Sequence, residues 1–185
     1  FHTNIEGTFN VLEACVRHNV KKLVYSSSAS VYGDAVELPM TEDHPYNNKT
    51  FYGATKIACE HMCRAYYHRY DLDYAGLRYM NVYGARQDYK GTYIAVIMKM
   101  LDRLDQGLPP QVYGDGSQAY DFIYVSDVAR ANICAMKAAA SDKNYNVGSG
   151  VQTSILELTN LILNITGSDQ RSSMNPPAKP SSPTA

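Results

Sequence analysis

The chain has 185 residues, which is long enough for one domain with a buried core, and 45% hydrophobic with 19% charged residues is ordinary for a globular protein. Its formal net charge of −1 leaves no basic excess, which argues against a nucleic-acid partner. No apolar run reaches the length of a membrane span and no signal peptide opens the chain, so we expect no membrane partner. The chain starts at Phe1 in mid-pattern, and we expect it to be part of a longer polypeptide.

The first half of the chain predicts helices and strands in alternation. Apolar positions at helical spacing predict a helix over 8–18. A β-rich run that ends in small polar residues predicts a buried strand over 22–27, and a loop rich in Gly, Asp, Pro and Asn follows over 32–50. A long helix over 52–70 and a second strand over 74–78 complete this half.

The second half continues the alternation with three helices and two short strands. The expected elements are helices over 93–106, 127–140 and 155–165, and strands over 111–113 and 145–147. Ser126 is the expected N-cap of the second of these helices. Ser154 with Glu157 three residues later forms a capping-box pattern at the start of the last helix.

Helices that alternate with strands predict an α/β fold in which a doubly wound parallel sheet has helices on both faces. Ligands of such sheets bind outside the carboxyl ends of the strands, so the residues just after each strand are site candidates. The segment 168–185 is rich in Ser and Pro with few apolar residues, and it predicts a loop or a disordered tail.

Neither the cysteines nor the histidines show the spacing of metal ligands. The four cysteines form no CxxC pair, and the five histidines are scattered, so no metal site is predicted. Cys59 and Cys63 lie four residues apart on one helix face, which favours a role in core packing. Reduced thiols of this kind indicate a cytoplasmic protein.

The sharpest group of candidate catalytic residues is Ser28, Tyr52 and Lys56. Tyr52 and Lys56 are spaced i, i+4 on one expected helix, so their side chains project from the same face. An ammonium beside a tyrosine favours the phenolate, which can act as a general base on a substrate hydroxyl. Ser28 follows the expected strand over 22–27, where its hydroxyl could hold the same substrate oxygen. Tyr-x-x-x-Lys alone occurs by chance in many helices, so the prediction depends on the order of strand, serines, loop and helix.

The residues around this group form a series of short motifs. They are, in chain order, NIEGT at 4–8, SSSASVYG at 26–33, YGATK at 52–56, LRYMNVYG at 77–84, YGDG at 113–116, DFIYVSDVA at 121–129 and NVG at 146–148. This series resembles the extended short-chain dehydrogenases that act on nucleotide sugars, the NAD-dependent epimerases and dehydratases. The resemblance implies a partial Rossmann-like domain over 1–167, without its N-terminal βα units and with part of a small substrate-binding lobe.

The resemblance also implies a mechanism. Tyr52 would take the proton from a sugar hydroxyl while hydride leaves the same carbon for NAD, and Ser28 would hydrogen-bond the reacting oxygen. Lys56 would bind the nicotinamide ribose hydroxyls and favour the phenolate form of Tyr52, so both side chains would contact the cofactor. The hydride chemistry belongs to the nicotinamide, and the protein supplies orientation and proton transfer.

Four further residues receive roles by the same resemblance. Asn4, Ser26 and Tyr79 would lie against the cofactor, and Asn81 would touch the sugar or the diphosphate. Two alternatives stay open: Asn4 could hold the backbone of a neighbouring strand, and Tyr79 could be a core aromatic that contributes only its main chain. Asn81 follows a strand, which favours a role in the site over a role in a turn.

The segments GARQD at 84–88 and YIAVI at 93–97 resemble the UDP-hexose 4-epimerase branch, particularly members that accept N-acetylated sugars. In that branch the positions of Ala95 and Val96 line the uridine site, and Tyr113 lies nearby. An amphipathic helix would show the same two residues, so both interpretations stay open. No acidic residue accompanies Ser28 as in the dehydratases, which disfavours 4,6-dehydration.

Two departures from the family pattern qualify the expected activity. Tyr120 stands where the family commonly has an arginine that grips a phosphate, and Arg86 or another group would have to replace it. The family's glycine-rich dinucleotide loop is absent, so we expect this chain alone to be incomplete for activity. The parent protein is expected to be an isomerase, and by resemblance a homodimer that pairs partly through the helix over 52–70. The alternatives are a dehydratase, decarboxylase or reductase of the same family, or a non-catalytic truncated member.

Overall fold

The computed structural model describes residues 1–88 and 95–176, and the chain forms two compact units. The first, which we call the sheet unit, contains Phe1–Val82 and Ile123–Gly148. The second, which we call the lobe unit, contains Tyr83–Phe122 and Ser149–Ala185. Neither unit is one continuous stretch of sequence, so each is completed by a segment that comes later in the chain.

The sheet unit is built on three parallel strands in the order β1-β2-β6: Lys22–Ser28, Asp73–Tyr79 and Lys143–Val147. Their register aligns the carboxyl ends, because Ser28 pairs with Tyr79 and Tyr79 pairs with Val147. β1 is one residue longer than expected, so Ser28 is its last residue and does not follow it. One row of the sheet therefore brings the ends of all three strands together, where ligands of such sheets bind.

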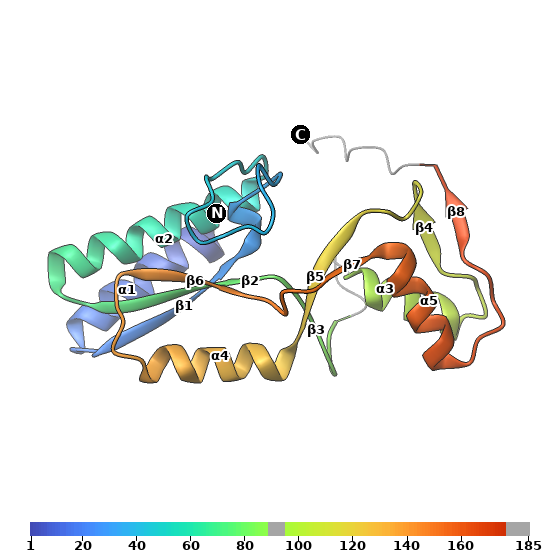
Figure 1. Cartoon of the computed structure of the whole chain (residues 1–185). Helices are drawn as coiled ribbons and strands as arrows, with labels where there is room; N and C mark the ends of the chain where they lie inside the picture. Colours follow the sequence, from blue (N-terminus) through green and yellow to red (C-terminus); the bar gives the residue numbers. More distant parts are fainter. Residues whose placement is uncertain (89–94, 177–185) are drawn as a thin grey trace. The chain divides into compact units, whose positions relative to one another are not determined.

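Helices cover both faces of this sheet, as expected (Figure 1). A π-helical turn (His2–Glu6), α1 (Gly7–Arg17) and α2 (Phe51–Tyr70) lie on one face, and α4 (Val125–Lys137) lies on the other. Thr50 caps α2, because its side chain accepts a hydrogen bond from the backbone N–H of Gly53 at 3.0 Å. The loop between β1 and α2 begins with a short 3-10 turn and has no longer helix or strand.

The two faces of the sheet have separate cores. The cluster under α1 and α2 contains Leu12, Cys15, Cys63, Tyr66, Leu72 and Tyr74. The cluster under α4 contains Ala75, Leu77, Ile123, Val128, Ala135 and Val147. The expected packing role of Cys59 and Cys63 is confirmed, because both free thiols are buried.

The described part of the lobe unit has two short helices with short strands around them. Its elements are α3 (Val96–Asp105), β4 (Gln111–Tyr113), β7 (Gln152–Ser154), α5 (Ile155–Thr166) and β8 (Ser173–Asn175). Its core contains Met100, Val112, Ile155, Leu158 and Ile162. The capping box at the start of α5 is present as expected, with bonds between Ser154 and Glu157 in both directions.

Two further strands pass from one unit to the other. β3 (Asn81–Tyr83) and β5 (Ala119–Tyr124) form a sheet with β7 in the order β3-β5-β7, and β5 pairs antiparallel with β7. The sequence did not predict these three strands, and the antiparallel pairing of β5 with β7 departs from an all-parallel sheet. The helix expected over 93–106 is present as α3, and its expected first residues, 93 and 94, lie outside the described residues.

Two further expectations from the sequence are wrong. Ser126 is not an N-cap, because Tyr124 holds the extended backbone conformation that precedes α4 and Ser126 lies inside the first turn. The segment after residue 168 is not all loop, because Ser173–Asn175 pairs in parallel with β4 as β8. No helix within residues 1–88 and 95–176 combines the length and the apolar content that crossing a membrane requires.

Candidate active site

Lys56 and Tyr52 lie on the first two turns of α2, beside the end of β1. Lys56 Nζ donates a hydrogen bond of 2.8 Å to the backbone carbonyl of Ser26. The same Nζ is 5.2 Å from the ring centroid of Tyr25 and 5.6 Å from that of Tyr52. Burial lowers the pKa of Lys56. The Tyr52 side chain is half exposed, so an ammonium held in place by the strand lies beside a phenol that a substrate can reach.

Ser28 closes β1 in the row that it shares with Tyr79. Its Oγ accepts a hydrogen bond of 3.2 Å from the backbone N–H of Ser30, so it caps the 3-10 turn Ala29–Val31. This bond uses a lone pair of Oγ and not its hydrogen, so the hydroxyl retains a donor for a substrate oxygen. The cap also orients Ser28 through the turn that follows it.

Tyr79 contributes its side chain as well as its main chain to this end of the sheet. Its hydroxyl lies 3.1 Å from Ser26 Oγ and donates a 3.0 Å hydrogen bond to Asn132 Oδ1 on α4. Its ring packs partly buried against the core under α4. Asn132 was not singled out from the sequence, because only the fold brings α4 to the end of β2.

Asn4 is bonded to α2 and not to a strand. Its amide donates a 2.8 Å hydrogen bond to Thr55 Oγ1, and its carbonyl accepts one of 3.2 Å from Cys59 Sγ. Thr55 Oγ1 in turn donates to the carbonyl of Tyr52 at 2.7 Å. Thr55 is therefore a link that the sequence analysis missed, although its place inside the YGATK motif was a signal for it.

Asn81, expected in the substrate site, begins β3 and is exposed. Tyr120 is also exposed, on β5, with its ring centroid 6.2 Å from that of Phe122. The neighbouring Asp121 carboxylate accepts hydrogen bonds of 2.7 to 2.8 Å from Ser149 and Gly150, which fixes the turn after β6. This turn belongs to the lobe unit, as does Tyr120.

The three residues expected near uridine all lie in the lobe unit. Ala95 is the residue before α3, and Val96 opens that helix and packs against the lobe core. Tyr113 ends β4 and is 46% exposed, and its hydroxyl donates to Gln111 Oε1 at 3.2 Å. Val96 thus has the packing role that an amphipathic helix gives it, whereas the side chain of Tyr113 remains available to a ligand. Arg86, the suggested substitute for the missing arginine, is exposed.

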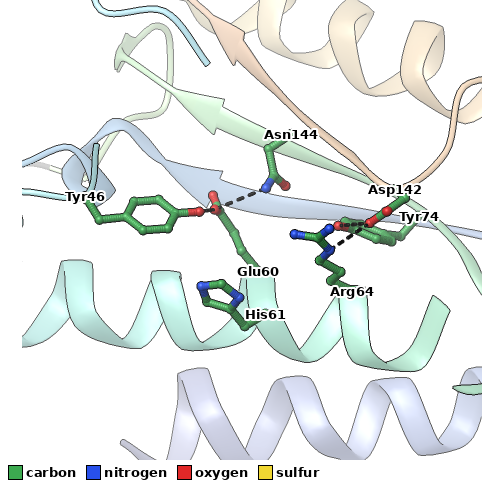
Figure 2. A pocket seen from close by; sticks show the side chains of 7 residues that line it. All are labelled: Tyr46, Glu60, His61, Arg64, Tyr74, Asp142 and Asn144. Carbon is green, nitrogen blue, oxygen red and sulfur yellow. Dashed lines mark hydrogen bonds and ion pairs between the residues drawn. The ribbon is translucent and has the colours of Figure 1, made fainter. Parts of the chain in front are cut away.

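A buried polar network that the sequence analysis did not identify lies beneath the candidate site. Glu60 and Arg78 form an ion pair of 2.8 Å, and their side chains are 2% and 4% exposed. Figure 2 shows Tyr46 and Asn144 approaching the Glu60 carboxylate from opposite sides, in a pocket of about 160 Å³. The i, i+4 spacing of Lys56 and Glu60 placed Glu60 on the face of the helix that carries the candidate site, but it did not indicate Arg78 as the partner.

The sequence and the fold of this chain are similar to those of known nucleotide-sugar enzymes. The profile of the NAD dependent epimerase/dehydratase family matches residues 1–148. A Methanocaldococcus jannaschii protein, provisionally named a UDP-glucose 4-epimerase, is 41% identical over 160 residues, which are 86% of this chain and 52% of that protein.

Two solved structures have nearly the same fold as this chain. The UDP-N-acetylglucosamine 4-epimerase from Methanobrevibacter ruminantium, in complex with UDP-N-acetylmuramic acid, superposes with a TM-score of 0.92 at 35% identity, over 96% of this chain and 57% of that one. The UDP-glucose 4-epimerase from Thermotoga maritima, with UDP-glucose, gives 0.91 at 35% identity, over 96% and 58%. The chain thus spans only about half the length of the proteins that it matches.

Proposed function

Because the chain belongs to the NAD-dependent epimerase/dehydratase family, we propose that the whole protein is an isomerase, a UDP-hexose 4-epimerase. The observation that carries this proposal is the position of Lys56, bonded to the end of β1 with its ammonium 5.6 Å from the Tyr52 ring. Ser28 ends the same strand, so a base, a cation and a hydroxyl donor gather at one edge of the sheet.

Each of these residues has a distinct part in the proposed reaction. Tyr52 accepts the proton of the sugar 4-hydroxyl, and the Lys56 ammonium lies 5.6 Å from its ring centroid. Ser28 donates a hydrogen bond to the same oxygen and so fixes the carbon that is oxidised. Tyr52 then gives the proton back to the 4-oxygen, and inversion requires that hydride, which bound NAD would supply, return to the opposite face of C4.

The residues at this edge fit a nicotinamide cofactor. Bound NAD supplies the acceptor and then the donor of the hydride. Lys56 offers N–H groups and Tyr52 offers its phenolic oxygen to the ribose, and Ser26 and Tyr79, whose hydroxyls lie 3.1 Å apart, line the wall beside it. Asn4 supports this wall indirectly in our proposal, because its amide is bonded to Thr55.

The substrate assignments rest on the relatives and on exposed groups. Asn81 is assigned to the sugar or the diphosphate, and Ala95, Val96 and Tyr113 to the uridine. The two solved relatives hold UDP-linked sugars, one of them N-acetylated, at equal identity to this chain, so both sugar classes are candidates. The partial domain proposed over 1–167 would carry these residues.

Assembly and location belong to the same proposal. We place the protein in the cytoplasm as a homodimer that pairs through the outer faces of α1 and α2. Phe9, Val11 and Tyr70 leave apolar surface on these helices, since each is 47 to 50% exposed. Sedimentation of the purified full-length protein tests the dimer, and a monomer would contradict it. Cell fractionation tests the location.

The experiment that tests the function uses the full-length protein without added cofactor. The purified protein is assayed for bound nicotinamide and incubated with UDP-glucose and with UDP-N-acetylglucosamine. Formation of the galacto epimers supports the proposal and shows that Tyr120 permits diphosphate binding. Bound NAD without an epimer would replace the epimerase by a dehydratase, decarboxylase or reductase. A protein with neither NAD nor product would be a non-catalytic member.

A further inference from the structure

We infer that the buried Glu60–Arg78 ion pair, which lies beneath the candidate site, has a positioning role. It holds Tyr52 and Lys56 of α2 at a fixed place relative to Ser28 of β1. This inference rests on the proposed function and adds residues that touch neither substrate nor cofactor. It is carried by the hydrogen bonds of the pair, by the burial of both side chains, and by the site residues that are adjacent in sequence to members of the network.

The pair is fully hydrogen-bonded. Arg78 Nε and Nη2 donate to the two oxygens of Glu60 at 2.9 and 2.8 Å, the bidentate geometry that aligns two planar groups. The remaining N–H groups of Arg78 donate to the Tyr32 hydroxyl, the Tyr46 hydroxyl and the Glu42 carbonyl at 2.8 to 2.9 Å. All five donors of the guanidinium therefore have acceptors, and its plane cannot turn without breaking a bond.

Glu60 is held as firmly by groups from three other elements. Ser27 Oγ donates to its Oε1 at 2.5 Å, and Tyr46 and Asn144 donate to its Oε2 at 2.7 and 3.2 Å (Figure 2). Burial, followed by the contact with Glu60, raises the pKa of Tyr46 to about 12, so its phenol stays protonated and keeps donating. The carboxylate thus ties α2 to β1, to β6 and to the loop before α2.

The network is connected to the site through neighbours in sequence. Glu60 lies one helical turn after Lys56 and two turns after Tyr52, on the same face of α2. Ser27 directly precedes Ser28 at the end of β1, and Arg78 directly precedes Tyr79. Each bond to Glu60 or Arg78 therefore fixes the backbone beside a residue that we assign to the reaction.

Stability alone does not explain such a pair. Removing two charges from water costs about as much as their attraction returns, so an apolar pair of similar volume would stabilise the fold equally well. An apolar pair would not fix the orientation of its side chains, because the hydrophobic effect is not directional. A misplacement of about 1 Å between reacting groups can lower a rate by roughly 100-fold, so a directional tie has a catalytic use.

The test compares two variants of Glu60 with a control from the same pocket, all in the full-length protein. Glu60→Gln keeps the shape but removes the charge, and Glu60→Asp keeps the charge but shortens the side chain. Tyr74→Phe is the control, since it deletes the 3.0 Å bond to Asp142 in the pocket of Figure 2, away from the carboxyl ends of the strands. If Glu60→Gln does not fold, Glu60→Asp provides the comparison.

Both Glu60 variants should lower kcat per folded molecule by about 10-fold to 100-fold, because the reacting groups lose their alignment, while KM for the UDP-sugar stays within about twofold. Tyr74→Phe should leave both constants near wild type. Equal kcat in the Glu60 variants and the wild type would overturn the inference and leave the pair a purely structural role.

A second measurement does not depend on turnover. Amide hydrogen exchange followed by mass spectrometry should accelerate in peptides that cover the end of β1 and the first turns of α2 in the Glu60 variants, and peptides of α5 should be unchanged. Uniform acceleration across all peptides would overturn the inference. If the wild-type protein forms no epimer, the proposed function fails, and the exchange pattern alone still decides whether Glu60 positions this edge.

Discussion

A single oxygen atom separates tyrosine from phenylalanine, and at position 52 that atom is the proposed base. Tyr52→Phe should reduce epimerisation by about four orders of magnitude, since general-base catalysis contributes up to about 10⁴-fold. The fold should be nearly unaffected, because the side chain is half exposed. Product formation by chromatography and a thermal melt measure the two effects. Activity that survives in this variant would exclude the mechanism.

The candidate residues differ in how far the sequence could predict them. Ser28, Tyr52 and Lys56 were found because they occur in a fixed order along adjacent elements, and their chemical roles remain proposals. Glu60 and Arg78 could not be paired from the sequence, because they lie 18 residues apart and meet only after α2 packs on β2. The YGATK motif pointed to Thr55, but nothing in the sequence indicated that the Asn4 amide donates to it, since the two residues lie 51 positions apart.

At the scale of elements, helix caps provide a matched pair of substitutions. Ser154 caps α5 with a capping box, whereas Ser126 lies exposed in the first turn of α4 without a capping bond. Ser154→Ala should cost about 1 kcal/mol, because it leaves the backbone N–H of Glu157 in α5 without its acceptor. Ser126→Ala should leave stability unchanged or slightly raised, since alanine has the higher helix propensity.

Thermal and urea unfolding of the two alanine variants measure this contrast. Equal losses of stability at both serines would mean that the capping box contributes nothing beyond the removal of a hydroxyl. A loss at Ser126 alone would restore the role that the sequence predicted for it.

Long elements were predictable, whereas of the three-residue strands only β4 was. The helix α2 has 20 residues, enough for helical spacing of apolar positions to be recognised, and α5 is marked by its capping box. Strands β3, β7 and β8 have three residues each, too few for an alternation of apolar and polar positions to be detected. The six residues of β5 are AYDFIY, in which no strict alternation exists. These strands form because partners from distant parts of the chain offer hydrogen bonds.

At the scale of the whole molecule, the buried ion pair should make stability depend on pH. Burial raises the pKa of Glu60, but hydrogen bonds from Arg78, Ser27 and Tyr46, together with the Arg78 charge, outweigh burial and leave the pKa below its usual value. An unfolded glutamate titrates near about 4.3. The carboxylate therefore contributes stability above that pH, and the contribution is lost as the pH falls through the lower folded value.

Urea unfolding of the full-length wild type and of Glu60→Gln, from about pH 6 to about pH 3, measures this contribution. The wild type should be the more stable protein at the upper pH, and the difference between the two should shrink as the pH falls, since glutamine does not titrate. Other carboxylates affect both proteins alike and cancel in the difference. A difference that stays constant over this range would show that the pKa of Glu60 is the same in the folded and unfolded states.

The chain passes between its two units at residues 82–83, 122–123 and 148–149. The family profile ends at residue 148, so it takes in the whole sheet unit but only the first of the two segments that build the lobe unit. Met100 and Val112 fall inside that boundary, while Ile155, Leu158 and Ile162, against which they pack, fall outside it. The stretch that matches the family profile therefore ends at a crossing between the units and separates the packed residues of one core.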